Sequence, residues 1–111
     1  MSEPIIIIQT TLPKSWEEFE VGSFSQILLE AGASCVQHST IKSMYRWDGE
    51  IASSSEWVLE IKVDSSNKES VISKIEEVHP YEIPQILFWN ALASDSYATW
   101  VQTDSSSFSK K

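Results

Sequence analysis

The sequence predicts an α+β fold of the ferredoxin-like, split βαβ kind, in which one antiparallel sheet carries two helices on one face. Strand-like and helix-like segments follow one another in the order strand, helix, strand, strand, helix, strand. The two middle strands are joined by Asp48-Gly49, a strong turn signal for a hairpin. At 111 residues the chain has room for one domain, which we place at residues 1–102.

The first strand is predicted at about residues 4–11. Ile5 to Ile8 is a short run of apolar, β-branched residues, which is typical of a strand buried on both faces. The segment that follows, ending in Pro13, interrupts this run and closes the strand.

A helix is predicted between this strand and Gly32. Ser15 and Glu18 have the spacing of a capping box, and apolar residues recur after them at near-helical intervals. Gly22 leaves two interpretations, because a glycine inside a helix costs about 1 kcal/mol relative to alanine. The helix is either continuous, or its first turns form an irregular piece and the regular helix begins near Ser23.

The second and third strands are predicted on either side of the turn. Apolar residues of one parity mark each strand: Cys35, Ile41, Tyr45 and Trp47 before the turn, and Trp57, Leu59, Ile61 and Val63 after it. If each strand runs about 14 residues at about 3.3 Å per residue, the hairpin reaches about 45 Å, whereas a compact chain of this length is roughly 34 Å across. We therefore expect the hairpin to overhang its domain and another copy of the chain to cover its exposed edges.

A second helix and a fourth strand complete the pattern. Ser66 and Glu69 have capping-box spacing, Pro80 ends the helix, and an apolar stripe at helical spacing lies between them: Val71, Ile72, Ile75 and Val78. Residues 83–91 are apolar enough for a strand. Pro84 lacks a ladder donor, so this strand lies at an edge of the sheet or has the proline at its start.

The end of the chain is predicted to hold a short helix and a tail. Ser94 can cap a helix that runs through Tyr97 and Trp100 to Val101. Residues 103–111 are rich in serine and have no apolar period, so we expect them to form a disordered tail.

Charge and composition argue against several classes of partner. A net charge of −8 repels phosphate backbones and anionic lipids, so we expect neither nucleic acid nor a membrane as a partner. The apolar run near Met1 is too short for a signal peptide or a membrane span. The single cysteine, Cys35, cannot form an intrachain disulfide, and we predict a cytoplasmic chain.

The sequence contains no common nucleotide-binding, hydrolase or zinc-cluster motif, so we predict no organic cofactor and no enzymatic activity. His79 is the strongest single candidate for a metal ligand. It precedes Pro80-Tyr81-Glu82 in a loop that can present imidazole and carboxylate to a metal ion. The alternative is a helix-terminal histidine whose ring hydrogen-bonds the last carbonyls of the helix. We interpret His38 as a surface or interface residue and Cys35 as a small apolar residue.

Three aromatic residues gather around the predicted hairpin: Tyr45, Trp47 and Trp57. They offer a stacking site for a ligand, but aromatic residues of long paired strands more often pack against a neighbouring strand or subunit. We therefore favour a subunit interface.

Six short motifs, taken together, resemble the signatures of one protein family. They are Thr10-Thr11-Leu12-Pro13, Ala33-Ser34-Cys35-Val36, Ser43 to Gly49, Glu56 with Lys62, His79 to Pro84, and Tyr97 to Trp100. In order and spacing they resemble the CutA family of divalent-cation tolerance proteins over about residues 5–102. The resemblance implies a ferredoxin-like homotrimer with hairpins paired edge to edge, and a role in tolerance to copper and other divalent cations.

The same resemblance implies Cu²⁺ or another divalent cation as the ligand, with His79 at the copper-ligand position. We expect Glu82 or another carboxylate to assist His79 in binding the ion. Lys62 and Tyr81, which belong to the motifs, join Tyr45, Trp47 and Trp57 as predicted residues of the interface or of the cleft between subunits. Thr10 and Val78 stand where some members carry a cysteine and a second histidine. A lone imidazole binds copper weakly unless carboxylates or a neighbouring subunit complete the coordination.

Two functional hypotheses follow. The first is a homotrimeric protein that binds divalent cations, copper above all, in the response to metal ions. The second is a PII-like trimeric signalling or assembly protein that binds a small molecule or an unknown protein partner at the cleft between subunits. The departures at Thr10 and Val78 favour the second, because the hairpin and the loop after His79 are kept while metal-ligand positions are not.

Overall fold

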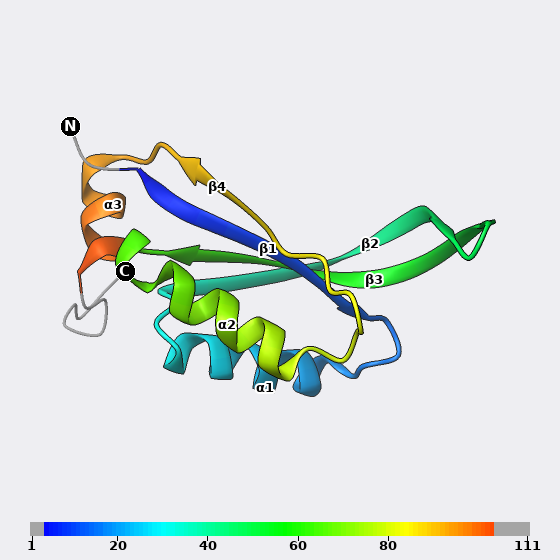
Figure 1. The fold of residues 1–111 in the computed structure, drawn as a ribbon. Coiled ribbons are helices and arrows are strands. Elements are labelled where there is room, and N and C mark those ends of the chain that lie inside the picture. The colour runs from blue at the N-terminus through cyan, green and yellow to red at the C-terminus, as the bar shows by residue number, and fades with distance from the viewer. Residues whose placement is uncertain (1–3, 104–111) are drawn as a thin grey trace.

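The computed structural model describes residues 4–103 as a four-stranded antiparallel sheet with two helices along one face and a third helix at one end (Figure 1). The strands lie in the order β2-β3-β1-β4. The elements are β1 (Ile5–Pro13), α1 (Glu18–Glu30), β2 (Cys35–Trp47), β3 (Glu50–Val63), a short 3₁₀ turn (Ser65–Asn67), α2 (Lys68–Val78), β4 (Leu87–Ala91) and α3 (Asp95–Gln102). The predicted fold class is confirmed.

The first strand is buried on both faces, as its apolar run predicts. Ile6 and Ile8 belong to the main core, which lies between the sheet and helices α1 and α2. Ile5 and Ile7 point to the other face, where Ala98 and Val101 of α3 cover them. The short helix α3 therefore closes one end of a sheet face that α1 and α2 do not reach.

Helix α1 is continuous through Gly22, so the interpretation of an irregular first piece is wrong. Val21 and Phe24 on either side of Gly22 are buried, and this packing outweighs the low helix propensity of one glycine. The predicted Ser15–Glu18 capping box is also wrong. The helix begins after Glu17, whose backbone N–H donates to the Glu20 carboxylate at 2.9 Å.

Helix α2 has the predicted apolar stripe, with Val71 and Ile75 fully buried, and it ends at Val78 before the proline. The predicted Ser66–Glu69 capping box is wrong, because Asp64 accepts the Ser66 N–H and thereby starts a 3₁₀ turn before the helix.

Strand β4 lies at an edge of the sheet, paired with β1 alone, which confirms the edge position that Pro84 indicated. The strand is shorter than predicted, because it begins at Leu87 and the residues before it form a loop. The predicted disordered tail lies outside the described residues, except for Thr103. Among the described helices, none has the length and apolar character needed to cross a membrane.

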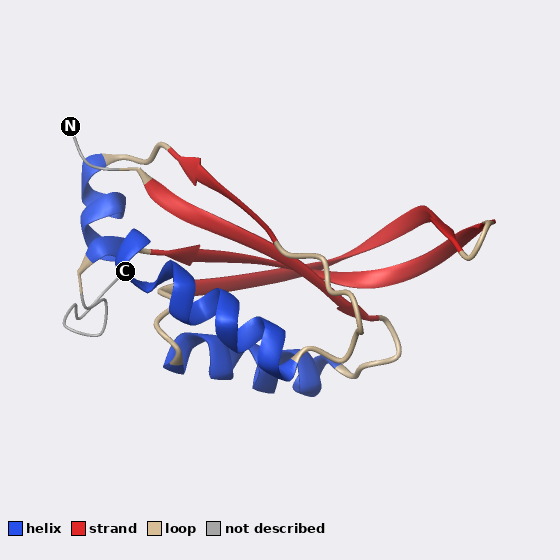
Figure 2. Ribbon diagram, in the orientation of Figure 1, coloured by secondary structure: helices blue, strands red, loops and turns tan. Residues whose placement is uncertain are grey.

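The hairpin extends well beyond the rest of the domain, as Figure 2 shows. Strands β2 and β3 have 13 and 14 residues, and they pair without interruption from Cys35–Lys62 to Trp47–Glu50. Asp48 and Gly49 make the turn with positive φ angles of 52° and 76°, the backbone that a tight hairpin of this twist requires. The described chain measures 47 Å along its longest axis and 28 Å across, so the predicted overhang is confirmed.

The two hairpin strands turn their apolar residues to opposite faces of the sheet. Trp57, Leu59, Ile61 and Val63 of β3 face α1 and α2. The register places the apolar residues of β2 on the other face, because Ile41 pairs with Glu56 and Tyr45 with Ala52. This face, called here the open face, also carries Leu87 and Trp89 of β4. Its large side chains are exposed in the single chain: Ile41, Tyr45, Trp47, Leu87 and Trp89.

Candidate functional site

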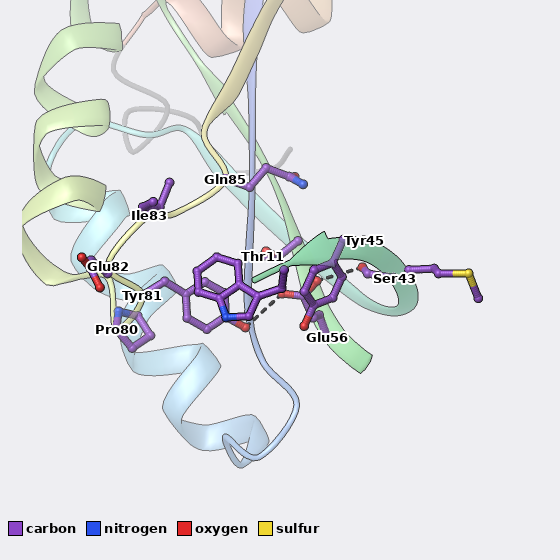
Figure 3. Close-up of a pocket in the computed structure, with 11 residues that line it drawn as sticks. Thr11, Ser43, Tyr45, Glu56, Pro80, Tyr81, Glu82, Ile83 and Gln85 are labelled. Atoms are coloured by element: carbon purple, nitrogen blue, oxygen red, sulfur yellow. Dashed lines mark hydrogen bonds between the residues drawn. The ribbon is translucent and has the colours of Figure 1, made fainter. Parts of the chain in front are cut away.

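A groove of about 770 Å³ lies between the hairpin and the loop that follows α2. Its walls come from three parts of the chain, β1, the hairpin and the loop (Figure 3). The lining residues are Thr11 of β1, Ser43, Met44, Tyr45, Trp47 and Glu56 of the hairpin, and Pro80, Tyr81, Glu82, Ile83 and Gln85 of the loop. This volume is within the range of small-molecule sites. The fold therefore brings the predicted loop to the base of the overhanging hairpin.

His79 fastens this loop to the sheet through both of its ring nitrogens. Its Nε2 lies 2.8 Å from the backbone oxygen of Thr11, and its Nδ1 accepts the backbone N–H of Tyr81 at 3.0 Å. A carbonyl oxygen can only accept, so Nε2 carries the proton and Nδ1 supplies its lone pair. The ring also packs edge-on against Phe24, with centroids 6.0 Å apart. His79 is thus a neutral imidazole in a fixed tautomer.

Partial burial lowers the pKa of His79 below its ordinary value of 6.5. The hydrogen bond to Thr11 and the negative charge of Glu56 act in the opposite direction, but the loss of hydration outweighs them. The ring therefore stays neutral at pH 7 and keeps both hydrogen bonds.

Glu56 of β3 is the second residue that attaches the loop to the sheet. Its two carboxylate oxygens accept hydrogen bonds from Ser43 Oγ at 2.8 Å and from the Tyr81 hydroxyl at 2.9 Å. Burial, and then the hydrogen bond to Glu56, raise the pKa of Tyr81 well above 10, so the phenol remains a donor. Because the Tyr81 amide is also bonded to His79, this one residue ties the loop to β1 and to β3.

The predicted site residues are only partly brought together. Tyr45, Trp47, Tyr81 and Glu82 all line the groove. Trp57 does not cluster with Tyr45 and Trp47, so that prediction is wrong: it faces α1 and α2, and its Nε1 donates to the Trp16 oxygen at 3.0 Å.

Lys62 lies away from the groove, opposite Cys35 at the other end of the hairpin. Its ammonium donates to Gln37 and lies 3.3 Å from the Glu60 carboxylate. The other predicted histidine, His38, lies 3.1 Å from the Glu18 carboxylate, also outside the groove.

The sequence analysis assigned no role to Glu56 or Ser43, which prove central to the site. Glu56 stood in the motifs only as a partner of Lys62. The hairpin pattern contained a usable signal, because Ser43 and Glu56 lie on the same face of paired strands, two positions apart along the register. The contact of Glu56 with Tyr81, 25 residues away, could not be read from this pattern.

The described residues of one chain do not supply a preformed copper site. Among residues 4–103 no three His, Cys, Asp or Glu side chains come together as a metal-binding group. The lone pair of His79 Nδ1 is already engaged by the Tyr81 N–H, and Glu82 is exposed on the loop. Thr10 is fully buried on the core side of β1, with a hydroxyl that has no hydrogen-bond partner.

The lowered pKa of His79 predicts a pH-dependent stability. As the pH falls, the unfolded chain takes up a proton on this imidazole before the folded chain does. The contribution of His79 to the free energy of unfolding is therefore complete above 6.5, and it is lost as the pH falls from 6.5 through the lowered pKa of the folded state.

Urea unfolding of the metal-free chain, from about pH 8 to about pH 5, measures this contribution. We expect His79→Gln to remove part of the pH dependence seen in the wild type, whereas His38→Gln, which removes the exposed imidazole, leaves that part in place. An unchanged pH dependence in His79→Gln would contradict the buried, neutral state of the ring.

Comparison with known proteins gives one consistent result. Residues 6–104 match the family model described as CutA1 divalent ion tolerance protein. The divalent-cation tolerance protein CutA of Pectobacterium atrosepticum is 33% identical over 61 residues, which cover 54% of this chain and 56% of that protein. The match thus spans just over half the length of that relative.

Two solved structures share the fold closely. The divalent ion tolerance protein CutA1 from Ehrlichia chaffeensis is similar with a TM-score of 0.79 at 29% identity, covering 89% of this chain and 92% of that one. The PII-like protein CutA from Nostoc sp. PCC 7120 is similar with a TM-score of 0.76 at 28% identity, covering 87% and 93%.

Proposed function

Because the chain belongs to the family of CutA1 divalent ion tolerance proteins, we propose that it acts in the response to divalent cations as a cytoplasmic homotrimer whose groove is a ligand site. The observation that carries the proposal is the groove itself, which His79 and Tyr81 hold open between the loop and the hairpin. Copper(II) is the first candidate ligand. The family is described by tolerance to divalent ions. We propose that the protein binds the ion and does not catalyse a reaction.

The trimer is supported by two features of the single chain. The hairpin overhangs the domain, which leaves long unpaired strand edges that proteins normally cover. The open face exposes large apolar side chains on the two edge strands of the sheet, β2 and β4: Ile41, Tyr45, Trp47, Leu87 and Trp89. A neighbouring copy of the chain can cover both, and we propose that the groove then lies at a boundary between subunits.

A divalent cation finds an acidic environment in the groove. Glu56 and Glu82 are among its lining residues, and the whole chain carries a net charge of −8. To bind His79 Nδ1, however, the cation must displace the Tyr81 N–H. We therefore propose that a second subunit completes the coordination, as the incomplete donor set of one chain requires.

Calorimetric titration with copper(II) at about pH 7, in a weakly coordinating buffer, tests this proposal. We expect saturable binding with a whole number of sites per trimer, and loss of that binding in His79→Ala. His38→Ala, which removes the histidine outside the groove, should bind as the wild type does. His79→Ala could also lose copper binding because the loop is displaced. Nitrogen coupling in the electron paramagnetic resonance spectrum of copper bound to the wild type shows directly that an imidazole is a ligand.

The second candidate is a PII-like protein that binds a small molecule or a protein partner in the same groove. The observation that favours it is the state of His79, since both ring nitrogens are used to hold the loop. Absent or nonspecific copper binding that His79→Ala leaves unchanged would contradict the first candidate and leave this one.

A further inference from the structure

We propose that the groove recognises a linear aliphatic diamine or polyamine, with a carboxylate for each terminal ammonium group and aromatic rings along its length. This inference rests on the proposed function in taking the groove as the ligand site. It adds a chemical class of ligand to that site.

The charges that line the groove are all of one sign. Glu56 and Glu82 are its acidic lining residues, and the described lining contains no Lys, Arg or His. The groups bonded to Glu56 are the hydroxyls of Ser43 and Tyr81, which are neutral. These hydrogen bonds hold the Glu56 carboxylate in place but do not neutralise its negative charge. The groove therefore complements a cation.

The two carboxylates lie at different ends of the groove. Figure 3 shows Glu56 beside Ser43 and Tyr45 on the hairpin, and Glu82 beside Pro80 on the loop, pointing away from Glu56. A single metal ion binds all of its ligands at about 2–2.6 Å, whereas these two carboxylates come from different walls of the groove, the hairpin and the loop. A flexible molecule with a cation at each end can reach both.

The remaining walls suit an ammonium group on an alkyl chain. Tyr45, Trp47 and Tyr81 line the space, and aromatic rings attract organic cations. An ionised carboxylate offers about four acceptor positions, so Glu56 keeps free positions beside its two hydrogen bonds.

Calorimetric titration with putrescine tests the inference, with 1,4-butanediol as the uncharged control of the same length. We expect one saturable putrescine site per chain and no binding of the diol. Glu82→Gln should raise the Kd for putrescine about tenfold or more, as expected for the loss of one charged hydrogen-bond partner. Glu76→Gln, an exposed position on α2 outside the groove, makes the same change in net charge and should leave the Kd unchanged.

A second variant, Glu56→Gln, should also raise the Kd, and its circular dichroism shows whether the fold is kept. Absence of saturable putrescine binding, equal binding of the diol, or an equal effect of Glu76→Gln and Glu82→Gln would overturn the inference. The copper titration is read separately. Copper binding without putrescine binding overturns this inference alone, whereas Glu82-dependent putrescine binding without copper binding supports it and overturns the copper assignment alone.

Discussion

Trp47→Ala is expected to dissociate the proposed trimer at concentrations where we expect the wild type to stay assembled. Trp47 is 62% exposed in the single chain and lies on the open face beside the hairpin turn. Truncation of a buried aromatic anchor at an interface costs about 2–4 kcal/mol, which raises a dissociation constant by about 30-fold or more. Sedimentation velocity over a range of protein concentrations measures this change.

Phe19→Ala is the matched control, because Phe19 is equally prominent, 73% exposed, but lies on α1 at the other layer of the fold. Its assembly should match that of the wild type, whereas Tyr45→Ala should weaken assembly as Trp47→Ala does. If Trp47→Ala and Tyr45→Ala leave assembly unchanged, these groove-lining side chains are not interface anchors.

His79→Ala should lower the free energy of unfolding by about 2–3 kcal/mol, since it removes two hydrogen bonds and leaves the Thr11 oxygen and the Tyr81 N–H without partners. The lost packing against Phe24 adds to this cost. Urea unfolding at one fixed protein concentration measures the loss, and hydrogen exchange at the Tyr81 amide should become faster.

His38→Ala is the control, and it should cost less than about 1 kcal/mol because its contact with Glu18 is at the surface. A value for His79→Ala within about 0.5 kcal/mol of the wild type would show that the loop does not depend on this ring.

The elements that could be predicted from the sequence are those whose signals are local. Period-two patterning and Asp48-Gly49 identified the hairpin, and the run from Ile5 to Ile8 identified a strand covered on both sides. The helix starts were misplaced, because the side chains that cap them depend on how the chain leaves the preceding strand. Asp64, at the end of β3, took the role expected of Ser66.

The candidate site was predictable only in part. The position of His79 after the helix marked it as a candidate. The two interpretations offered from the sequence were a metal ligand and a ring hydrogen bonded at the end of the helix. Its hydrogen bond to Thr11 joins residues 68 apart in the sequence, and no spacing rule indicates such a contact. The apolar parity of β2 was visible in the sequence, but only the register with β3 shows that Tyr45 and Trp47 face away from α1 and α2.

Multi-angle light scattering of the wild-type protein at micromolar concentration tests the central claim most directly. The claim is that copies of this chain cover the overhanging hairpin and the open face, and so complete the groove. We expect a particle of three times 12.6 kDa. A particle of 12.6 kDa would contradict the account, because the exposed row of Ile41, Tyr45, Trp47, Leu87 and Trp89 would then need a different partner.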